Sequence, residues 1–93
     1  MNLNVKAHII VSGRVQGVYF RGNTRKEAQK HDVSGWVQNL PNGRVEAILE
    51  GEKENVDKLI EIVKKGPSHA YVTNLEIEWL EYTGEFKDFQ IRY

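Results

Sequence analysis

The residues best suited to chemistry lie in one glycine-containing segment that ends on an arginine, GRVQGVYFR at positions 13–21. An alternating apolar stretch precedes it and a helical composition follows, so we expect a loop that leads into a helix. Such a loop directs unpaired backbone N–H groups toward one point, where the helix dipole also favours an anion. Gly17 permits a positive φ, and Arg21 carries a planar fork that can bind two phosphate oxygens. The alternative, common for glycine-rich loops, is an ordinary connection with a solvated arginine.

The residue types that this loop lacks limit the kinds of reaction that it could catalyse. It contains no Asp, Glu, His, Cys or Lys, and so offers no general acid, no nucleophile with a base and no evident magnesium ligand. It also lacks the Lys-Ser/Thr pair of nucleotide-binding loops, and Val15 stands where a cysteine phosphatase has its nucleophile. We therefore expect a substrate whose leaving group departs unaided, such as a mixed carboxylic–phosphoric anhydride.

Asn39 is a second candidate for chemistry. The turn predicted at residues 40–43 already has its asparagine in Asn42, so Asn39 is surplus to the turn. At the end of a strand its amide could hold a water through both donor and acceptor. The alternative is an Asn that bonds its own backbone, which residue type alone favours.

Sequence patterns predict the elements that position these residues. Five strands are expected, at residues 4–12, 33–38, 44–51, 75–79 and 89–93. Two helices are expected, at about 21–31 and 52–65. Thr24 and Glu27 form a capping box, which would place the start of the first helix a few residues later. The sequence LPNG at 40–43 predicts a hairpin turn, and Gly66-Pro67 ends the second helix.

This order of elements is β-α-β-β-α-β with a short extra C-terminal strand. Two helices of this length cover only one face of a mostly antiparallel sheet, which predicts an α+β two-layer sandwich of the ferredoxin-like type. The chain has 93 residues and no linker, repeat or low-complexity stretch, so we expect a single domain over residues 1–93. The fold hosts many unrelated activities and does not by itself settle function.

Composition argues against several classes of protein. Lys+Arg and Asp+Glu number 13 each, whereas proteins that bind nucleic acids or membranes usually carry a basic excess. The absence of cysteine excludes disulfides, thiolate metal sites and a cysteine nucleophile, and is typical of a cytoplasmic protein of this size. We expect no signal peptide or membrane span. The three histidines are isolated in sequence, so no metal site is expected from them.

At these residues the sequence closely resembles the acylphosphatase family. GRVQGVYFR at 13–21 matches the first family signature, G-x-V-Q-G-V-x-F-R. GWVQN at 35–39, followed by NGRVE at 42–46 and by Gly51, matches the second. Gly66-Pro67 and the ending FQIRY at 89–93 are also similar to family members, so the resemblance covers nearly the whole chain. Gly22 departs from the bulkier residues typical of its position, and we expect it to loosen the first helical turn.

The resemblance implies the chemistry of the family. The phosphate-binding arginine falls on Arg21 and the water-orienting asparagine on Asn39. The backbone amides implied as the phosphate cradle are those of Gln16, Gly17, Val18, Tyr19, Phe20 and Arg21. Water attacks phosphorus in line and the carboxylate leaves, with no metal, cofactor or phosphoenzyme. The implied substrates are small acyl phosphates, including acetyl phosphate, carbamoyl phosphate and 1,3-bisphosphoglycerate, and the enzyme is expected to be a monomer.

Three alternatives remain at this point. A phosphate-binding domain without activity would keep the loop but lose the water-orienting residue, whereas Asn39 is present. An RNA-binding domain of the same topology should carry exposed aromatics on its central strands, and the strand at 44–51 has none. An acylphosphatase-like domain can also belong to a larger carbamoyl-transfer protein. Recognisable strands near both ends of the sequence lead us to expect a free-standing chain.

Overall fold

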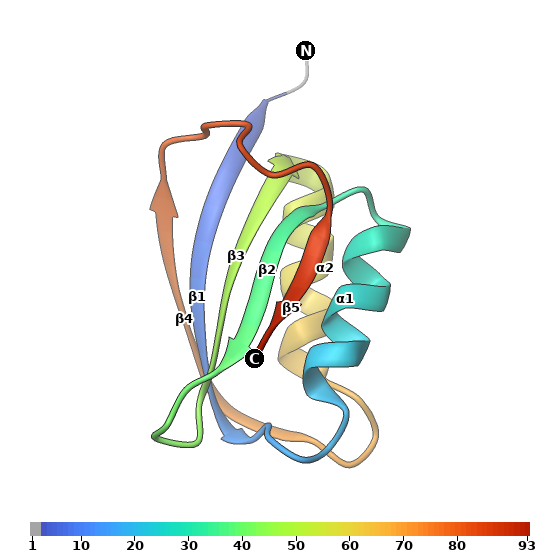
Figure 1. Cartoon of the computed structure of the whole chain (residues 1–93), viewed down its shortest axis with the longest axis vertical. Helices are drawn as coiled ribbons and strands as arrows, with labels where there is room; N and C mark the ends of the chain where they lie inside the picture. Colours follow the sequence, from blue (N-terminus) through green and yellow to red (C-terminus); the bar gives the residue numbers. More distant parts are fainter. Residues whose placement is uncertain (1–2) are drawn as a thin grey trace.

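The computed structural model describes residues 3–93 and contains one five-stranded sheet and two helices (Figure 1). In chain order the elements are β1 (Asn4–Arg14), α1 (Phe20–Lys30), β2 (Ser34–Asn39), β3 (Val45–Glu52), α2 (Lys53–Lys65), β4 (Tyr71–Leu80) and β5 (Phe89–Arg92). This is the predicted order, including the short extra strand at the C-terminal end.

The strands lie in the order β4-β1-β3-β2-β5, and both helices cover the same face of the sheet (Figure 1). All neighbouring strands are antiparallel except β2 and β5, which run parallel. Because β1 and β2 point the same way with α1 between them, their carboxyl ends reach the edge of the sheet at which α1 begins. The predicted ferredoxin-like sandwich is confirmed.

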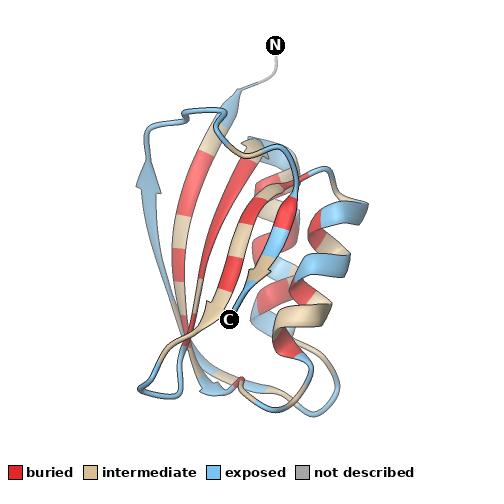
Figure 2. Ribbon diagram, in the orientation of Figure 1, coloured by how far each residue is buried: buried red, intermediate tan, exposed pale blue. Residues whose placement is uncertain are grey.

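The core lies between the sheet and the helices, and the alternation of the strands sets it. Apolar residues pair across strands on the helix-facing side, as in Ala7 with Leu49 and Val37 with Ala47, and all four are buried. Helix α2 buries one apolar stripe against them, formed by Val56, Leu59, Ile60 and Val63. Figure 2 shows the buried bands on the central strands and on the inner sides of both helices. Each fully buried Val, Leu or Ile side chain contributes about 1.5–3 kcal/mol, and this burial on one face fixes the register of the sheet.

Two boundaries near the loop differ from the sequence prediction. Helix α1 begins at Phe20, and the predicted capping box is wrong, because the Thr24 hydroxyl lies inside the helix and donates to the Phe20 carbonyl oxygen at 2.8 Å. Strand β1 continues through Arg14, since its pairing with β4 resumes beyond a bulge at Ser12 and Gly13. The loop therefore comprises only residues 15–19.

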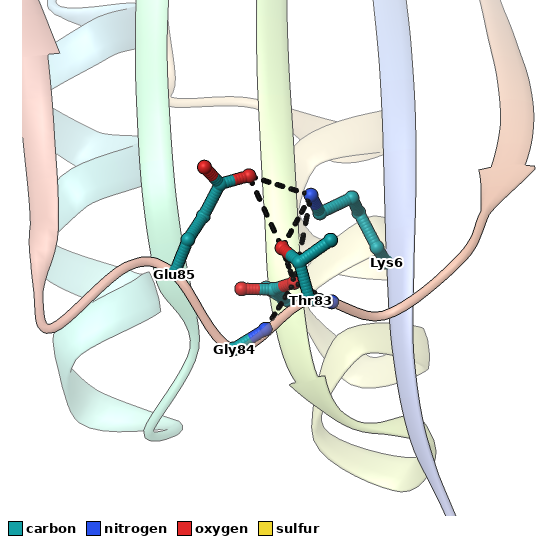
Figure 3. Close-up of polar contacts among 5 residues, drawn as sticks. Lys6, Thr83, Gly84 and Glu85 are labelled. Atoms are coloured by element: carbon teal, nitrogen blue, oxygen red, sulfur yellow. Dashed lines mark hydrogen bonds and ion pairs between the residues drawn. The ribbon is translucent and has the colours of Figure 1, made fainter.

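The connection between β4 and β5, residues 81–88, is held on the helix-free face of the sheet by a buried polar cluster (Figure 3). The Glu50 carboxylate accepts hydrogen bonds from the N–H groups of Thr83 and Gly84, at 2.8 and 3.0 Å, and from the Thr83 hydroxyl at 3.0 Å. Lys6 Nζ lies 3.6 Å from Glu50 and 2.9 Å from Glu85. Burial raises the pKa of Glu50, but these donors and Lys6 outweigh it and hold that pKa below its usual value. The cluster thereby sets the path by which the chain returns to β5.

Candidate active site

A pocket of about 320 Å³ opens at the end of the sheet where β1, β2 and β5 finish and α1 begins. It is lined by residues from the loop, the first turns of α1 and the ends of β2 and β5: Val15, Gly17, Tyr19, Phe20, Arg21, Gly22, Arg25, Asn39, Ile91 and Tyr93. Arg21 and Asn39, the two side chains singled out in the sequence, therefore meet in one pocket.

The loop has the backbone conformation of an anion cradle. Gly17 and Tyr19 both adopt positive φ, at 73° and 66°, on either side of Val18. Alternation of this kind turns successive N–H groups toward a common concavity. Within residues 3–93 no backbone or side-chain acceptor is bonded to the loop N–H groups, and the first intrahelical bond of α1 runs from Asn23 N–H to Tyr19 O at 3.0 Å. Neither a capping side chain nor an acidic residue occupies the first turn of α1, so the positive end of its dipole stays available.

The loop is tied to the β2–β3 hairpin through Gln16. Its side-chain amide donates to the carbonyl oxygens of Leu40 and Arg44, at 2.8 and 2.9 Å. These two residues flank the hairpin turn and are themselves joined by a bond from Leu40 N–H to Arg44 O at 2.8 Å. The tether therefore fixes the loop relative to Asn39, the residue immediately before Leu40.

Arg21 lies in the first turn of α1 with its charge directed toward the end of β5. Its Nη1 donates to the Arg92 carbonyl oxygen at 3.3 Å, and its guanidinium carbon lies 4.8 Å from the centre of the Tyr93 ring. Among the described residues these are its polar contacts, and neither is a carboxylate. The guanidinium is thus oriented by neutral groups and keeps its full charge for an anion in the pocket.

Asn39 ends β2 and is half-buried on the helix-facing side of the sheet. Its Oδ1 is buried and, within residues 3–93, accepts no hydrogen bond. This oxygen therefore does not form the hydrogen bond to its own backbone that was the alternative role for Asn39. Asn42 supplies the turn instead, because its Oδ1 accepts from Arg44 N–H at 3.0 Å. An unpartnered buried acceptor costs about 1–3 kcal/mol, and in a pocket it marks a place for a donor from a bound molecule.

Comparison with known proteins gives the family. The chain matches the family described as Acylphosphatase over residues 7–91. It is 53% identical over 88 residues to the acylphosphatase of Syntrophus aciditrophicus (strain SB), covering 95% of this chain and 92% of that protein. The chain belongs to the acylphosphatase family.

Solved acylphosphatases share the whole fold of the chain. The crystal structure of acylphosphatase from Bacillus subtilis superposes with a TM-score of 0.92 at 37% identity, over 96% of this chain and 99% of that one. An acylphosphatase structure from Coxiella burnetii gives a TM-score of 0.91 at 38% identity, over 96% and 93% of the two chains. The predicted family and enzyme class are confirmed.

The donor set of this acylphosphatase pocket suits an anion and not a metal ion. Its lining contains two arginines and no Asp, Glu, His or Cys side chain. In the described part of the chain no group of three or more His, Cys, Asp or Glu residues could hold a metal. His8 lies on the helix-free face, where its Nε2 is 2.7 Å from a carboxylate oxygen of Glu46. Neither described helix has the length and hydrophobicity needed to traverse a bilayer.

Two features of the site escaped the sequence prediction. Gln16 was expected to contribute only its backbone amide, whereas its side chain fixes the loop to the hairpin. Its place between Val15 and Gly17 in the first signature was the available signal. Gly22 does not loosen the first turn, which is closed by the bond from Asn23 to Tyr19. Instead, its missing Cβ makes room for the Tyr19 ring.

Proposed function

We propose that this chain hydrolyses the carboxyl–phosphate bond of acyl phosphates by direct attack of water, with Arg21 and the loop amides binding the phosphate and Asn39 orienting the water. Family membership supports the activity. The residue roles rest on one observation: a single pocket holds both the Arg21 guanidinium, which forms no ion pair within the described residues, and the buried Asn39 amide oxygen, which accepts no hydrogen bond from them.

The binding step places the phosphate at the start of α1. The cradle consists of the backbone amides of Gln16, Gly17, Val18, Tyr19, Phe20 and Arg21. The Arg21 guanidinium adds a two-pronged contact to phosphate oxygens. Because these donors are held by the fold before the substrate arrives, they need no rearrangement as charge shifts on the phosphoryl oxygens, which is the condition for strong electrostatic catalysis.

The chemical step needs one water. Asn39 Oδ1 accepts a hydrogen bond from this water and aligns its oxygen with phosphorus. A new P–O bond forms as the bond between phosphorus and the carboxyl oxygen breaks, and the electron pair leaves with the carboxylate. Both protons of the water end on inorganic phosphate. The carboxylate is a good leaving group, so no general acid is required, and the pocket lining contains no Asp, Glu, His, Cys or Lys side chain. The proposal therefore includes neither a metal ion nor a phosphoenzyme.

We propose that the protein acts as a monomer in the cytoplasm on a small-molecule substrate. A cysteine-free sequence supports an intracellular location. The absence of aromatic residues from β1 and β3 argues against RNA binding on the helix-free face. Neutral net charge argues against nucleic-acid and membrane-surface partners.

The test is the release of phosphate from acetyl phosphate in the presence of a chelator, compared with release from an alkyl phosphomonoester. We expect hydrolysis of acetyl phosphate with the chelator present, essentially none of the monoester, and competitive inhibition by inorganic phosphate. Arg21→Ala should lower kcat/KM by at least about a hundredfold, the scale of losing one transition-state donor. Arg14→Ala is the matched control, because Arg14 is exposed at the end of β1 and does not line the pocket.

Three results would contradict the proposal. Efficient cleavage of the alkyl monoester would require a general acid, and the proposal assigns none. Loss of activity on chelation would require a metal. Near-normal activity of a folded Arg21→Ala protein would place the phosphate elsewhere.

A further inference from the structure

Tyr19 is exposed at the mouth of the pocket in a backbone conformation that its residue type disfavours. It is the residue before α1 and adopts φ 66° and ψ 23°, in the left-handed region. Such a conformation is unfavourable for a residue with a Cβ and is found mainly where the surrounding structure imposes it. The residue is 65% exposed, although its side chain is a large aromatic group. The backbone amide of Tyr19 belongs to the proposed cradle, whereas its ring has no role in binding phosphate.

Gly22 provides the surface on which this ring rests. A Cβ built on Gly22 would overlap Cε1 of Tyr19 and lie 2.8 Å from its Cδ1. Gly22 does not have a positive φ, so its own backbone does not require glycine, and glycine is a poor helix former at this position. The absence of a side chain at Gly22 therefore allows the Tyr19 ring to lie against the first turn of α1.

The ring borders the same pocket as Arg21 and Asn39. Asn39 comes from the sheet layer, whereas Tyr19 and Gly22 come from the start of the helix layer. In an in-line displacement the attacking water and the leaving group occupy opposite sides of phosphorus. Water held by Asn39 therefore directs the acyl group away from the end of β2, toward the side of the pocket formed by Tyr19 and Gly22.

We infer that the Tyr19 ring, seated on Gly22, is a specificity-determining wall for the acyl group and favours planar apolar acyl phosphates over small aliphatic ones. This inference rests on the proposed function, since it names the substrate class of the same site. An aromatic ring offers a flat apolar surface for stacking. The contact exists before and during the reaction, so it acts mainly on KM and leaves kcat little changed.

The experiment compares kcat/KM for benzoyl phosphate and acetyl phosphate in the protein and in variants, and uses the ratio as its readout. Intrinsic reactivity of the two substrates cancels when ratios are compared between variants. Tyr19→Gly removes the ring while favouring the positive φ of this position. Gly22→Ala displaces the ring by the Cβ contact described above. We expect each to lower the benzoyl-to-acetyl ratio about fivefold, the size of an aromatic contact, through a rise in the KM for benzoyl phosphate.

Two further variants serve as controls. Tyr19→Phe keeps the ring and should keep the ratio. Arg25→Gln changes a residue that lines the same pocket one turn further along α1. The charge of Arg25 does not distinguish two uncharged acyl groups. The benzoyl-to-acetyl ratio of this variant should therefore match that of the unmodified protein.

The outcomes separate this inference from the function on which it rests. Hydrolysis of neither substrate by the unmodified protein contradicts the proposed function. Hydrolysis of both, with a ratio that stays within twofold in Tyr19→Gly and Gly22→Ala, overturns the role of Tyr19 alone. A change in Gly22→Ala without one in Tyr19→Gly, or an equal change in Arg25→Gln, also overturns it, because the ring would then not be the cause.

Discussion

Replacing Asn39 with alanine should change stability and catalysis in ways that a merely structural asparagine would not. Asn39 Oδ1 is buried and accepts no hydrogen bond from the described residues. A buried acceptor in this state costs about 1–3 kcal/mol, and alanine removes it. The substitution also loses some packing of a half-buried side chain. We therefore expect the free energy of unfolding of Asn39→Ala to lie within about 1 kcal/mol of the original value, or above it.

The effect on the reaction should be large. If Oδ1 aligns the attacking water, its loss resembles the loss of one preorganised transition-state group, which lowers kcat by about 10²–10³-fold, equivalent to about 2.7–4 kcal/mol. Phosphate affinity should hardly change, because Arg21 and the loop amides hold the ground-state anion. Asn39→Asp nearly preserves shape but places a negative charge beside an anionic substrate, so it should weaken both binding and turnover.

The assay combines acetyl phosphate kinetics, inhibition by inorganic phosphate and urea unfolding on each protein. Asn42→Ala is the matched control, because Asn42 is an exposed asparagine whose Oδ1 accepts a backbone bond from Arg44. It should lose a little stability and keep its kcat, the reverse of Asn39→Ala. Retention of most of the kcat by Asn39→Ala, together with a clear loss of stability, would refute the water-orienting role.

Two further predictions concern Arg21 and the buried cluster on the helix-free face. Arg21→Lys should remain well below normal activity in acetyl phosphate kinetics, because an ammonium cannot make the two-pronged contact; full rescue would show that charge alone suffices. The pKa of Glu50 is below its unfolded value, so the stability that Glu50 provides is present above about pH 4.5 and lost as pH falls through its folded pKa. Glu50→Gln should therefore be less stable than the original protein at pH 7, and urea unfolding should show the difference shrinking toward pH 3. An undiminished difference in acid would mean that the Glu50 charge contributes nothing.

Local sequence patterns predict the order of the elements and the kind of chemistry expected of the loop. Both depend on neighbours along the chain: the alternation in β1, the apolar stripe from Val56 to Val63, and the hairpin turn before β3 are local patterns. The anion-binding role of the loop could also be predicted from local sequence, because a strand, a glycine and a helix start are enough to place free N–H groups together. The residue types absent from that loop already favoured a substrate with a good leaving group.

Local patterns misjudged two boundaries for a physical reason. Thr24 and Glu27 have the spacing of a capping box, but α1 starts at Phe20 because Tyr19 takes the left-handed conformation before it. Strand β1 extends through Arg14 because β4 pairs with it beyond the bulge. In each case a contact or a conformation set by the surrounding fold prevailed over a weak local preference.

Which distant groups share the pocket depends on the tertiary structure. It brought Asn39 to the loop through the packing of β2 beside β3, and left its Oδ1 without a hydrogen-bond donor among residues 3–93. It placed the Arg92 carbonyl oxygen and the Tyr93 ring on Arg21 through the parallel pairing of β5 with β2. It also laid the ring of Tyr19 on Gly22. These contacts depend on sheet register and on the burial of one apolar face, which are set by the whole core and not by neighbouring residues in the chain.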